Sequence, residues 1–314
     1  MSGEECEGYC KKGLMHGFVR KYDTKSKMVF FGFYQNGIPS GVCWKIIPNG
    51  GCLVGVVDDR GNFSGSEIVY LFPNFKTAFL GEFRENGELI QGQATTLECL
   101  VVENGLLIPL FQDPDPSGPI YHSDVANFEI MSKSPMLVDP YESDMVEVRP
   151  SKVDGANEGL FARRYIPPNT LLAFYNGLRR YPKTKWKKTD WVVSAYRIED
   201  PTREKGSLDI PGEFRDFKNY RASLAHKTNH SFLPSAEIDD FVHPRFGLIP
   251  CIVSITDIDV DEEIFIHYGY GLNHCPEWYV DAWSKGEYPI PESFKEWHNK
   301  VVPTITDEIT TTEI

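Results

Sequence analysis

The sequence predicts a mainly β protein: an antiparallel sheet of repeated hairpins, then a second domain of short strands, and finally a short C-terminal helix. Two observations lead to this prediction. In the first third of the chain, pairs of glycines recur at intervals of 24, 24 and 26 residues, and a fixed period of this size is typical of stacked supersecondary units. The length of 314 residues exceeds what most single hydrophobic cores hold, so two domains are expected.

The glycine pairs mark the expected hairpin turns. They occur in GLMHG (13–17), GIPSG (37–41), GNFSG (61–65) and GELIQG (87–92). Glycine adopts the positive φ angles of tight hairpin turns without a steric penalty. Strand-like runs rich in β-branched and aromatic residues lie at 28–34, 42–47, 52–57, 68–72 and 77–83. The spacing resembles that of MORN repeats, and this resemblance implies an elongated β-array.

A change in composition marks the expected domain boundary. From QDPDPSGP (112–119) onward the chain is rich in Pro, Asp and Ser, as is common where one domain ends and another begins. Short strand-like runs dominate again after residue 145. The expected divisions are a β-array over 1–111, a linker over 112–145, a second β-rich domain over 146–275, a C-terminal helical segment over 276–300 and a flexible tail over 301–314.

The composition indicates a soluble globular protein with an acidic surface. Hydrophobic residues make up 41% and charged residues 25% of the chain, which is ordinary for this class. The 45 acidic and 32 basic residues give a net charge of −13, and a negative potential attracts cationic partners and repels phosphate. We therefore expect a basic protein partner and no direct contact with nucleic acid.

Neither a targeting segment nor a membrane span is expected. The first residues, MSGEECEGYC, are acidic and lack an apolar stretch, and no apolar run reaches the roughly 18 residues needed to cross a bilayer. Seven cysteines without a CxxC pair argue against a disulfide framework and against a zinc cluster. The chain is expected to be cytosolic or nuclear, without membrane contact.

The heptapeptide HKTNHSF (226–232) places two histidines four residues apart around an asparagine. Histidines at this spacing bind zinc in metalloproteases, but that signature needs Glu directly after the first histidine, and the cation Lys227 stands there. The sequence contains no G-x-S-x-G or G-x-x-x-x-G-K-[ST] motif, so a hydrolase elbow and a phosphate loop are not expected. From the heptapeptide alone, His230 is as readily a buried imidazole, and Asn229 a turn residue.

Four motifs in a fixed order give the heptapeptide another interpretation. They are NEGLFA (157–162), FYNG (174–177), NHSF (229–232) and EEIFIHYGY (262–270). Together they resemble a SET-domain protein lysine methyltransferase. Further matches are DPYES (139–143), FVHPRFG (241–247) and PEWY (276–279). With the MORN-like array in front, the chain resembles the family that monomethylates lysine four of histone H3 and various non-histone lysines.

The resemblance implies a fold and a cofactor. The fold is a β-rich SET domain with a pseudoknot, in which the strand leading to the final tyrosines threads past the NHSF turn. Asn229 and His230 would then bracket S-adenosylmethionine, with no metal involved. The other implied cofactor-binding residues are Ala156, Asn157, Glu158, Lys227, Trp278 and Asp281.

Specific roles within this set follow from charge and shape. Either Glu158 or backbone groups of the same turn would bind the ammonium of the cofactor, and Lys227 would offset its carboxylate. Trp278 would stack on the adenine, with Asp281 available for a polar contact. The alternative for Trp278 is an ordinary core aromatic.

Methyl transfer requires a neutral lysine amine. The unperturbed pKa of a lysine side chain is near 10.4, so about one amine in a thousand is neutral near pH 7.4. Removing the proton from the ammonium at this pH costs about 4 kcal/mol. A site that removes the ammonium from water lowers this cost. The resemblance places Tyr175, Tyr268 and Tyr270 around the lysine as a channel, orienting the amine about 3 to 3.5 Å from the methyl group. Tyr268 is the first candidate for the catalytic role.

Two departures from the family pattern bear on activity. Ile238 stands where the family has a tyrosine that hydrogen-bonds the target amine, so the pocket gains room and we expect dimethylation. Asn157 replaces the first glycine of a G-x-G turn, but Asn tolerates the left-handed conformation better than most residues, so cofactor binding is expected to survive. The implied substrate-binding residues are Tyr175, His230, Ile238, Tyr268 and Tyr270.

Two charged segments have open interpretations. Acidic EIDDF (237–241) lies where a basic peptide substrate would run, although most such runs are solvated surface. Basic RRYPKTKWKK (179–188) is either an exposed loop or a nuclear-import patch.

The sequence thus predicts an S-adenosylmethionine-dependent protein lysine methyltransferase that acts on the histone H3 tail or another lysine-bearing protein. We expect a monomer in the nucleus, on chromosomes, with a cytoplasmic fraction. The alternative is a scaffold protein with MORN-like repeats and a decayed SET domain. The retained residues Tyr175, Tyr268 and Tyr270 favour the enzyme, whereas Ile238 and Asn157 favour the scaffold.

Overall fold

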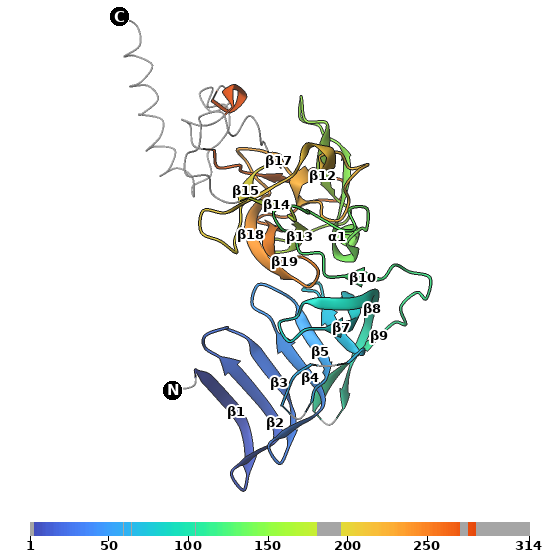
Figure 1. Ribbon diagram of the computed structural model, residues 1–314, viewed down its shortest axis with the longest axis vertical. Helices are drawn as coiled ribbons and strands as arrows, with labels where there is room; N and C mark the ends of the chain where they lie inside the picture. The colour runs from blue at the N-terminus through green and yellow to red at the C-terminus, as the bar shows by residue number, and fades with distance from the viewer. Residues whose placement is uncertain are drawn as a thin grey trace, which may run out of the picture.

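The computed structural model describes residues 3–58, 60–63, 65–103, 105–180, 196–270 and 276–280. It is mainly β, as predicted, and consists of two parts stacked along the long axis (Figure 1). A large antiparallel sheet forms one end, and a second domain of smaller sheets forms the other. Among the described residues, no helix is long and apolar enough to span a membrane.

The N-terminal sheet is a meander in which most strands pair with their sequence neighbours. Its strands are β1 (Glu4–Lys11), β2 (Leu14–Asp23), β3 (Val29–Gln35), β4 (Ile38–Ile46), β5 (Cys52–Val56), β6 (Ile68–Leu71), β7 (Thr77–Phe83), β8 (Leu89–Glu103), β9 (Leu106–Phe111) and β10 (Tyr121–His122). β9 pairs with β8 outside the main order, and β10 closes the edge beside β8. The repeated hairpins predicted from the glycine spacing are therefore present.

The first glycine of each pair occupies a turn. Gly13, Gly37, Gly61 and Gly87 all have φ angles between 78° and 86°, where a side chain would be strained. The prediction is wrong for Gly17 and Gly41, which lie inside β2 and β4, and for Gly92, which lies inside β8. A Cβ there would lie 2.6 Å from the carbonyl oxygen of Leu80 on β7, so Gly92 allows a close approach of strands instead of a turn.

The expected linker over 112–145 contains structure of its own. Tyr121 in β10 pairs with Gly92, so this segment extends the N-terminal sheet. The helix α1 (Pro140–Met145) begins at Asp139, whose side chain accepts hydrogen bonds from the backbone N–H groups of Tyr141 and Glu142. This is the usual N-cap arrangement, with proline at the first helical position.

The described part of the second domain contains three small sheets. β11 (Val146–Pro150) pairs with β12 (Glu158–Ala162). A five-stranded sheet has the order β13 (Leu171–Phe174), β19 (Gly247–Ser254), β18 (Ala236–His243), β20 (Phe265–Ile266) and β17 (Asn229–His230). The third sheet has the order β14 (Leu178–Arg180), β16 (Ser207–Asp209) and β15 (Ile198–Glu199). Two 3₁₀ turns, η1 (Gly212–Phe214) and η2 (Ala225–Lys227), connect these strands.

The strand β20 lies between two segments from earlier in the chain. It runs parallel to β17, with His230 opposite Ile266, and parallel to β18, with Ala236 opposite Ile266. Further along, the backbone N–H of Tyr268 lies 3.1 Å from Nδ1 of His230. This is the arrangement that the expected pseudoknot requires. Residues 277–280 begin the predicted C-terminal helix, whereas 281–314 lie outside the described residues.

The β18–β19 hairpin joins the two parts of the molecule (Figure 1). The N–H of Val242 donates to the Asn49 carbonyl at 2.5 Å, and the N–H of Leu89 donates to the Pro244 carbonyl at 2.8 Å. The buried hydroxyl of Tyr70 donates to the Val242 carbonyl at 2.8 Å and accepts from the N–H of Gly51 at 2.7 Å. One hydroxyl thus links a strand of the N-terminal sheet to the hairpin.

Replacing Tyr70 by Phe should lower the free energy of unfolding by about 2 kcal/mol, because a buried N–H and a buried carbonyl both lose this partner. Urea denaturation of the whole chain measures the change. The control is Tyr9→Phe, at a residue that is 80% exposed on the same sheet, which should change the free energy by less than about 0.5 kcal/mol. Equal stability of the two variants would contradict the bridging role.

Candidate active site

A cavity of about 560 Å³ opens in the second domain. Most of the predicted cofactor-binding residues line it: Ala156, Asn157, Glu158, Lys227, Asn229 and Trp278. Tyr268 and Tyr270 also reach it. The sequence interpretation missed Gly155, Tyr196, Arg215, Asp216, His226 and Pro276, which line the same cavity. His230 instead lines an adjoining cavity of about 390 Å³, together with Trp278 and Tyr268, and Asp281 lies outside the described residues.

A charge pair lies at the wall of the large cavity. The buried ammonium of Lys227 contacts the Glu158 carboxylate and the Arg215 carbonyl. The side chain of Lys227 is only 3% exposed, against 31% for Glu158. Glu158 and Lys227, which were predicted to bind the ammonium and the carboxylate of the cofactor, therefore form an ion pair with each other. The Glu158 carboxylate is the more accessible member of the pair.

A polar network fixes Asn229 at the start of β17. Its amide nitrogen lies 3.0 Å from the Glu158 carbonyl, 3.0 Å from Oε1 of Glu263 and 3.1 Å from Oγ of Ser151. Ser151 donates to the same Glu263 oxygen at 2.6 Å. A Cβ at position 159 would overlap this carboxylate, so Gly159 gives it room.

Glu263 is a site-supporting residue that sequence reasoning missed. It is 2% exposed, although a carboxylate is seldom buried without partners. The only indication in the sequence was its place in EEIFIHYGY, directly before the hydrophobic residue Ile264, which is also buried. Its partner Asn229 is 34 residues away.

A third, narrow cavity of about 90 Å³ adjoins the largest of the three. It is lined by Tyr175, Tyr196, Arg197, Ile198, Ala225, His226, Thr228, Ile238, Ile266, Tyr268 and Tyr270. Tyr196, His226, Tyr268 and Tyr270 line both cavities. The structure therefore brings the three predicted channel tyrosines and Ile238 together around one small space. The predicted substrate-binding residue His230 does not line it.

The hydroxyl groups of two channel tyrosines are held by backbone carbonyls. Tyr175 donates to the Tyr196 carbonyl at 2.5 Å, and Tyr268 donates to the Thr228 carbonyl at 3.0 Å. Burial raises the pKa of both phenols above the ordinary value. Both therefore stay protonated near neutral pH, and their oxygens keep lone pairs that can accept further hydrogen bonds.

Trp278 is half exposed, at 50%, so it is not an ordinary core aromatic. Its ring lies 5.8 Å from the His230 ring and 6.5 Å from the Tyr270 ring. The neighbouring Tyr279 is fully buried and fills the core position instead. Trp278 thus presents an aromatic face to both larger cavities.

The histidines of the heptapeptide are neutral. Burial, together with the cation Lys227, lowers the pKa of His226 to about 3. Burial and His267 lower the pKa of His230 to about 4. In the described part of the chain, no three His, Cys, Asp or Glu side chains are arranged to hold a metal ion.

Of the two charged segments, the acidic one contributes to the wall of the narrow cavity. EIDDF belongs to β18, with Ile238 in the cavity wall. Burial, followed by the carboxylates of Asp239 and Asp200, raises the pKa of Asp240. Of the basic run, Arg179 is bound to Asp200 at 2.5 Å, and 181–188 lie outside the described residues.

A tyrosine-walled channel that meets a larger polar cavity, inside a fold with β20 threaded between β17 and β18, defines a SET-domain protein lysine methyltransferase. Comparison with known proteins agrees. Residues 157–269 match the SET-domain family model, and residues 34–105 match the family described as "Histone H3 K4-specific methyltransferase SET7 N-terminal". The chain is 35% identical over 269 residues to "Histone-lysine N-methyltransferase SETD7" of Halocynthia roretzi, covering 82% of this chain and 68% of that protein.

The chain belongs to the SET7-type family of histone-lysine methyltransferases. It is an S-adenosylmethionine-dependent protein-lysine N-methyltransferase, as predicted. The comparisons give no support to the scaffold alternative.

Two solved structures that are similar to part of the chain illustrate the likeness. One is ctPRC2 bound to S-adenosylmethionine, with 17% identity, a TM-score of 0.30, and coverage of 46% of this chain and 17% of that chain. Another is KRYPTONITE in complex with DNA, an H3 peptide and SAH, with 18% identity, a TM-score of 0.30, and coverage of 42% and 25%.

Acidification should destabilise the protein through His226. The unfolded residue has a pKa near 6.5 and the folded one about 3, so below pH 6.5 the unfolded chain binds a proton that the folded chain excludes. Stability is therefore lost as the pH falls, by about 2 kcal/mol between pH 8 and pH 5 for this residue. Urea denaturation across this range should show a smaller loss in His226→Gln. Identical pH dependence of the two proteins would contradict a neutral buried imidazole.

Proposed function

We propose that the narrow cavity is the lysine channel and that Tyr268, Tyr175 and Tyr270 form its reactive end. The observation that carries this proposal is that the cavity of about 90 Å³ adjoins the large cavity at residues common to both. A side chain entering from one cavity would meet a group bound in the other. The substrate would be a lysine in a basic protein segment, such as the histone H3 tail.

The large cavity suits S-adenosylmethionine in size and in chemistry. The Lys227 ammonium and the more exposed Glu158 carboxylate lie together in its wall, where they could meet the carboxylate and ammonium of the cofactor's amino-acid end. Trp278 offers an aromatic face to the adenine. Ala156, Asn157, Asn229 and His230 would supply the remaining contacts. When bound, the cofactor supplies an electrophilic methyl group on a positively charged sulfur.

The channel residues would lower the cost of presenting a neutral amine. Aromatic rings around the lysine displace water, which disfavours the charged form. The hydroxyl protons of Tyr175 and Tyr268 are committed to backbone carbonyls, so their oxygens face the space as acceptors. An acceptor near the methyl group can also polarise it through weak CH···O contacts. His226 is neutral beside them, so it adds no charge that would repel the ammonium on entry.

The cell location and the oligomeric state expected from the sequence are also proposals. We propose a nuclear, chromosomal protein with a cytoplasmic fraction, acting as a monomer without direct contact to nucleic acid. The acidic net charge of −13 supports a basic protein substrate over a nucleic acid. We also propose that the N-terminal array consists of MORN-like repeats, because its turn glycines recur at intervals of 24, 24 and 26 residues.

Tyr268→Phe should reduce kcat for methyl transfer by about 30-fold, because it removes one acceptor from the reacting end of the channel. The dissociation constant for S-adenosylmethionine should change by less than about 3-fold, since the ring remains. Incubation with labelled cofactor and histone H3 measures transfer, and calorimetry measures binding. Tyr165→Phe, which loses an exposed hydroxyl bound to Asp257, should be as active as the wild type. Full activity of Tyr268→Phe would refute the catalytic assignment.

The wild-type enzyme should form dimethyllysine, because Ile238 lines the channel without a hydroxyl to restrain the amine. Ile238→Tyr should shift the products toward monomethyllysine. Mass spectrometry of a methylated H3 peptide gives the ratio at equal extents of reaction. A wild-type product that is purely monomethylated, and is unchanged by Ile238→Tyr, would be inconsistent with this role.

A further inference from the structure

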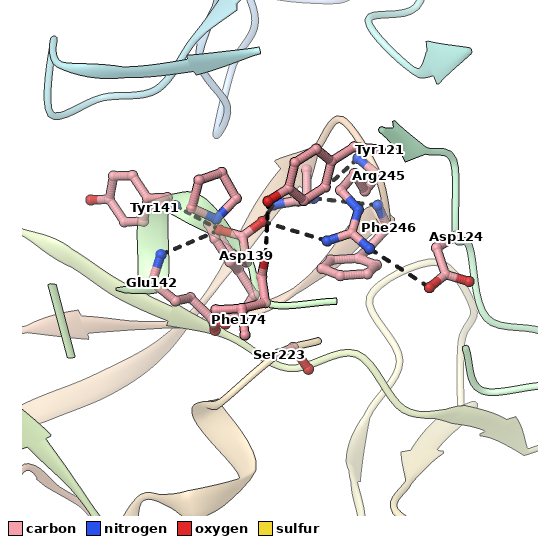
Figure 2. A network of polar contacts seen from close by, with 12 residues as sticks. Tyr121, Asp124, Asp139, Tyr141, Glu142, Phe174, Ser223, Arg245 and Phe246 are labelled. Atoms are coloured by element: carbon pink, nitrogen blue, oxygen red, sulfur yellow. Dashed lines mark hydrogen bonds and ion pairs between the residues drawn. The ribbon is translucent and has the colours of Figure 1, made fainter. Parts of the chain in front are cut away.

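Glu142 is a fully buried acid that methyl transfer does not use directly. It lies in α1 and is 0% exposed. Its Oε1 accepts a hydrogen bond from the N–H of Phe174 at 2.6 Å and another from the N–H of Leu224 at 2.9 Å. These donors are 32 and 82 residues away along the chain. One carboxylate oxygen therefore binds two segments that are far apart in the sequence. Figure 2 labels Glu142, Phe174 and Ser223, the residue before Leu224.

Both segments carry walls of the narrow cavity. Phe174 precedes Tyr175, and Leu224 precedes the turn η2, which carries Ala225 and His226 and ends at Thr228. The carbonyl of Thr228 in turn holds the Tyr268 hydroxyl. The Glu142 carboxyl thus sets the separation between the strand that bears one channel tyrosine and the turn that orients another.

The backbone N–H groups of Tyr175 and of its two sequence neighbours all have hydrogen-bond partners. The N–H of Tyr175 donates to the Pro250 carbonyl at 2.8 Å, and the N–H of Asn176 donates to Oγ of Ser223 at 3.1 Å. With the bond from Phe174 to Glu142, three consecutive amides have partners. Two of these partners are side chains, so ordinary sheet pairing does not place this end of β13 by itself.

Burial of the Glu142 carboxyl group at this position is unfavourable for the stability of the fold. Burial, reinforced by Asp139, raises the pKa of Glu142 well above its usual range. Its second oxygen, Oε2, has no hydrogen-bond partner among the described residues. An unsatisfied buried polar atom is destabilising, and perturbed buried acids gather at functional sites.

A second network holds α1 in place (Figure 2). Nδ1 of His243 faces the N–H groups of Arg245 and Phe246 at 3.1 and 3.4 Å, so its Nε2 carries the proton and donates to Asp139 at 3.1 Å. Asp139 is also the N-cap of α1. The Arg245 guanidinium lies 3.9 Å from Asp124 and above the Tyr121 ring. The helix that carries Glu142 is thereby fixed to the β18–β19 hairpin.

We propose that Glu142 is a positioning residue for methyl transfer, which sets the geometry of the lysine channel by binding the amides of Phe174 and Leu224. This inference rests on the proposed function of the channel. Glu142 touches neither lysine nor cofactor, so its effect should fall on kcat and on the extent of methylation, not on cofactor binding.

The test compares four variants of the whole chain with the wild type. Glu142→Leu removes the acceptor. Glu142→Gln keeps a carbonyl oxygen for both amides. Ser223→Ala removes the neighbouring acceptor of the Asn176 N–H together with the contact between Ser223 Oγ and the Tyr220 hydroxyl, and is a milder change if Glu142→Leu does not fold. The matched control is Tyr141→Phe, the adjacent buried residue of α1, which loses one hydrogen bond of 2.7 Å to the Leu171 carbonyl on the same strand β13.

The measurements are kcat and KM for an H3 peptide, the dissociation constant for S-adenosylmethionine, the ratio of methylated products and the melting temperature. Glu142→Leu should lower kcat by about 30-fold and change the product ratio, because displacements near 1 Å have effects of this size. Ser223→Ala should lower kcat by about 5-fold. Glu142→Gln should stay within about 3-fold of the wild type, and Tyr141→Phe within about 2-fold despite a lower melting temperature. Cofactor affinity should be unchanged in all four.

The following outcomes would overturn the proposed role of Glu142. Wild-type kcat in Glu142→Leu, or in Ser223→Ala where Glu142→Leu is unfolded, would overturn the proposal. So would an equal loss of kcat in Tyr141→Phe, since the effect would then be general destabilisation. An equal loss in Glu142→Gln and Glu142→Leu would also overturn it, because the acceptor would not be the relevant feature. A wild-type protein that binds cofactor but transfers no methyl group would instead overturn the proposed function, and the positioning role with it.

Discussion

In the proposed lysine channel, the chemistry depends on the exclusion of water from one amine. The walls of the narrow cavity include two phenol rings whose hydroxyl groups donate to the carbonyls of Tyr196 and Thr228. If those carbonyls moved, the phenols would rotate toward other acceptors and the wall would open. The chemistry of the side chains is therefore controlled by backbone placement, and the rest of the domain serves to fix that backbone.

Buried charge does much of this fixing. Glu263 holds Asn229 at the start of β17, and Lys227 holds Glu158 in the cavity wall. Breaking such pairs by removing one partner is strongly destabilising, whereas their net contribution to stability is small. Their retention is better explained by geometry than by stability, since each pair joins a loop of the cavity to a strand of the core. Asp139 and His243 form another buried pair, which joins the N-cap of α1 to β18.

Local patterns predicted the fold better than they predicted the supports of the site. Turn glycines such as Gly37 and Gly87 act within a few residues, so their spacing was sufficient to predict the hairpins. Tyr175 and Tyr268 come together as the resemblance implied, because each lies in a recognisable motif. Glu263 and His226 could not be assigned in this way. Their roles arise from contacts between residues far apart in sequence, and no local period encodes burial of a polar group.

The parallel pairing of β17 with β20 also dictates when the active site can exist during synthesis. The N-terminal meander joins mostly sequence neighbours, so its hairpins can close one after another as they leave the ribosome. The pairing of His230 with Ile266 must await the last strand of the domain. A translating chain would thus carry a folded array for many seconds before its catalytic half could close, and nascent protein should remain inert toward histones until β20 has left the ribosome.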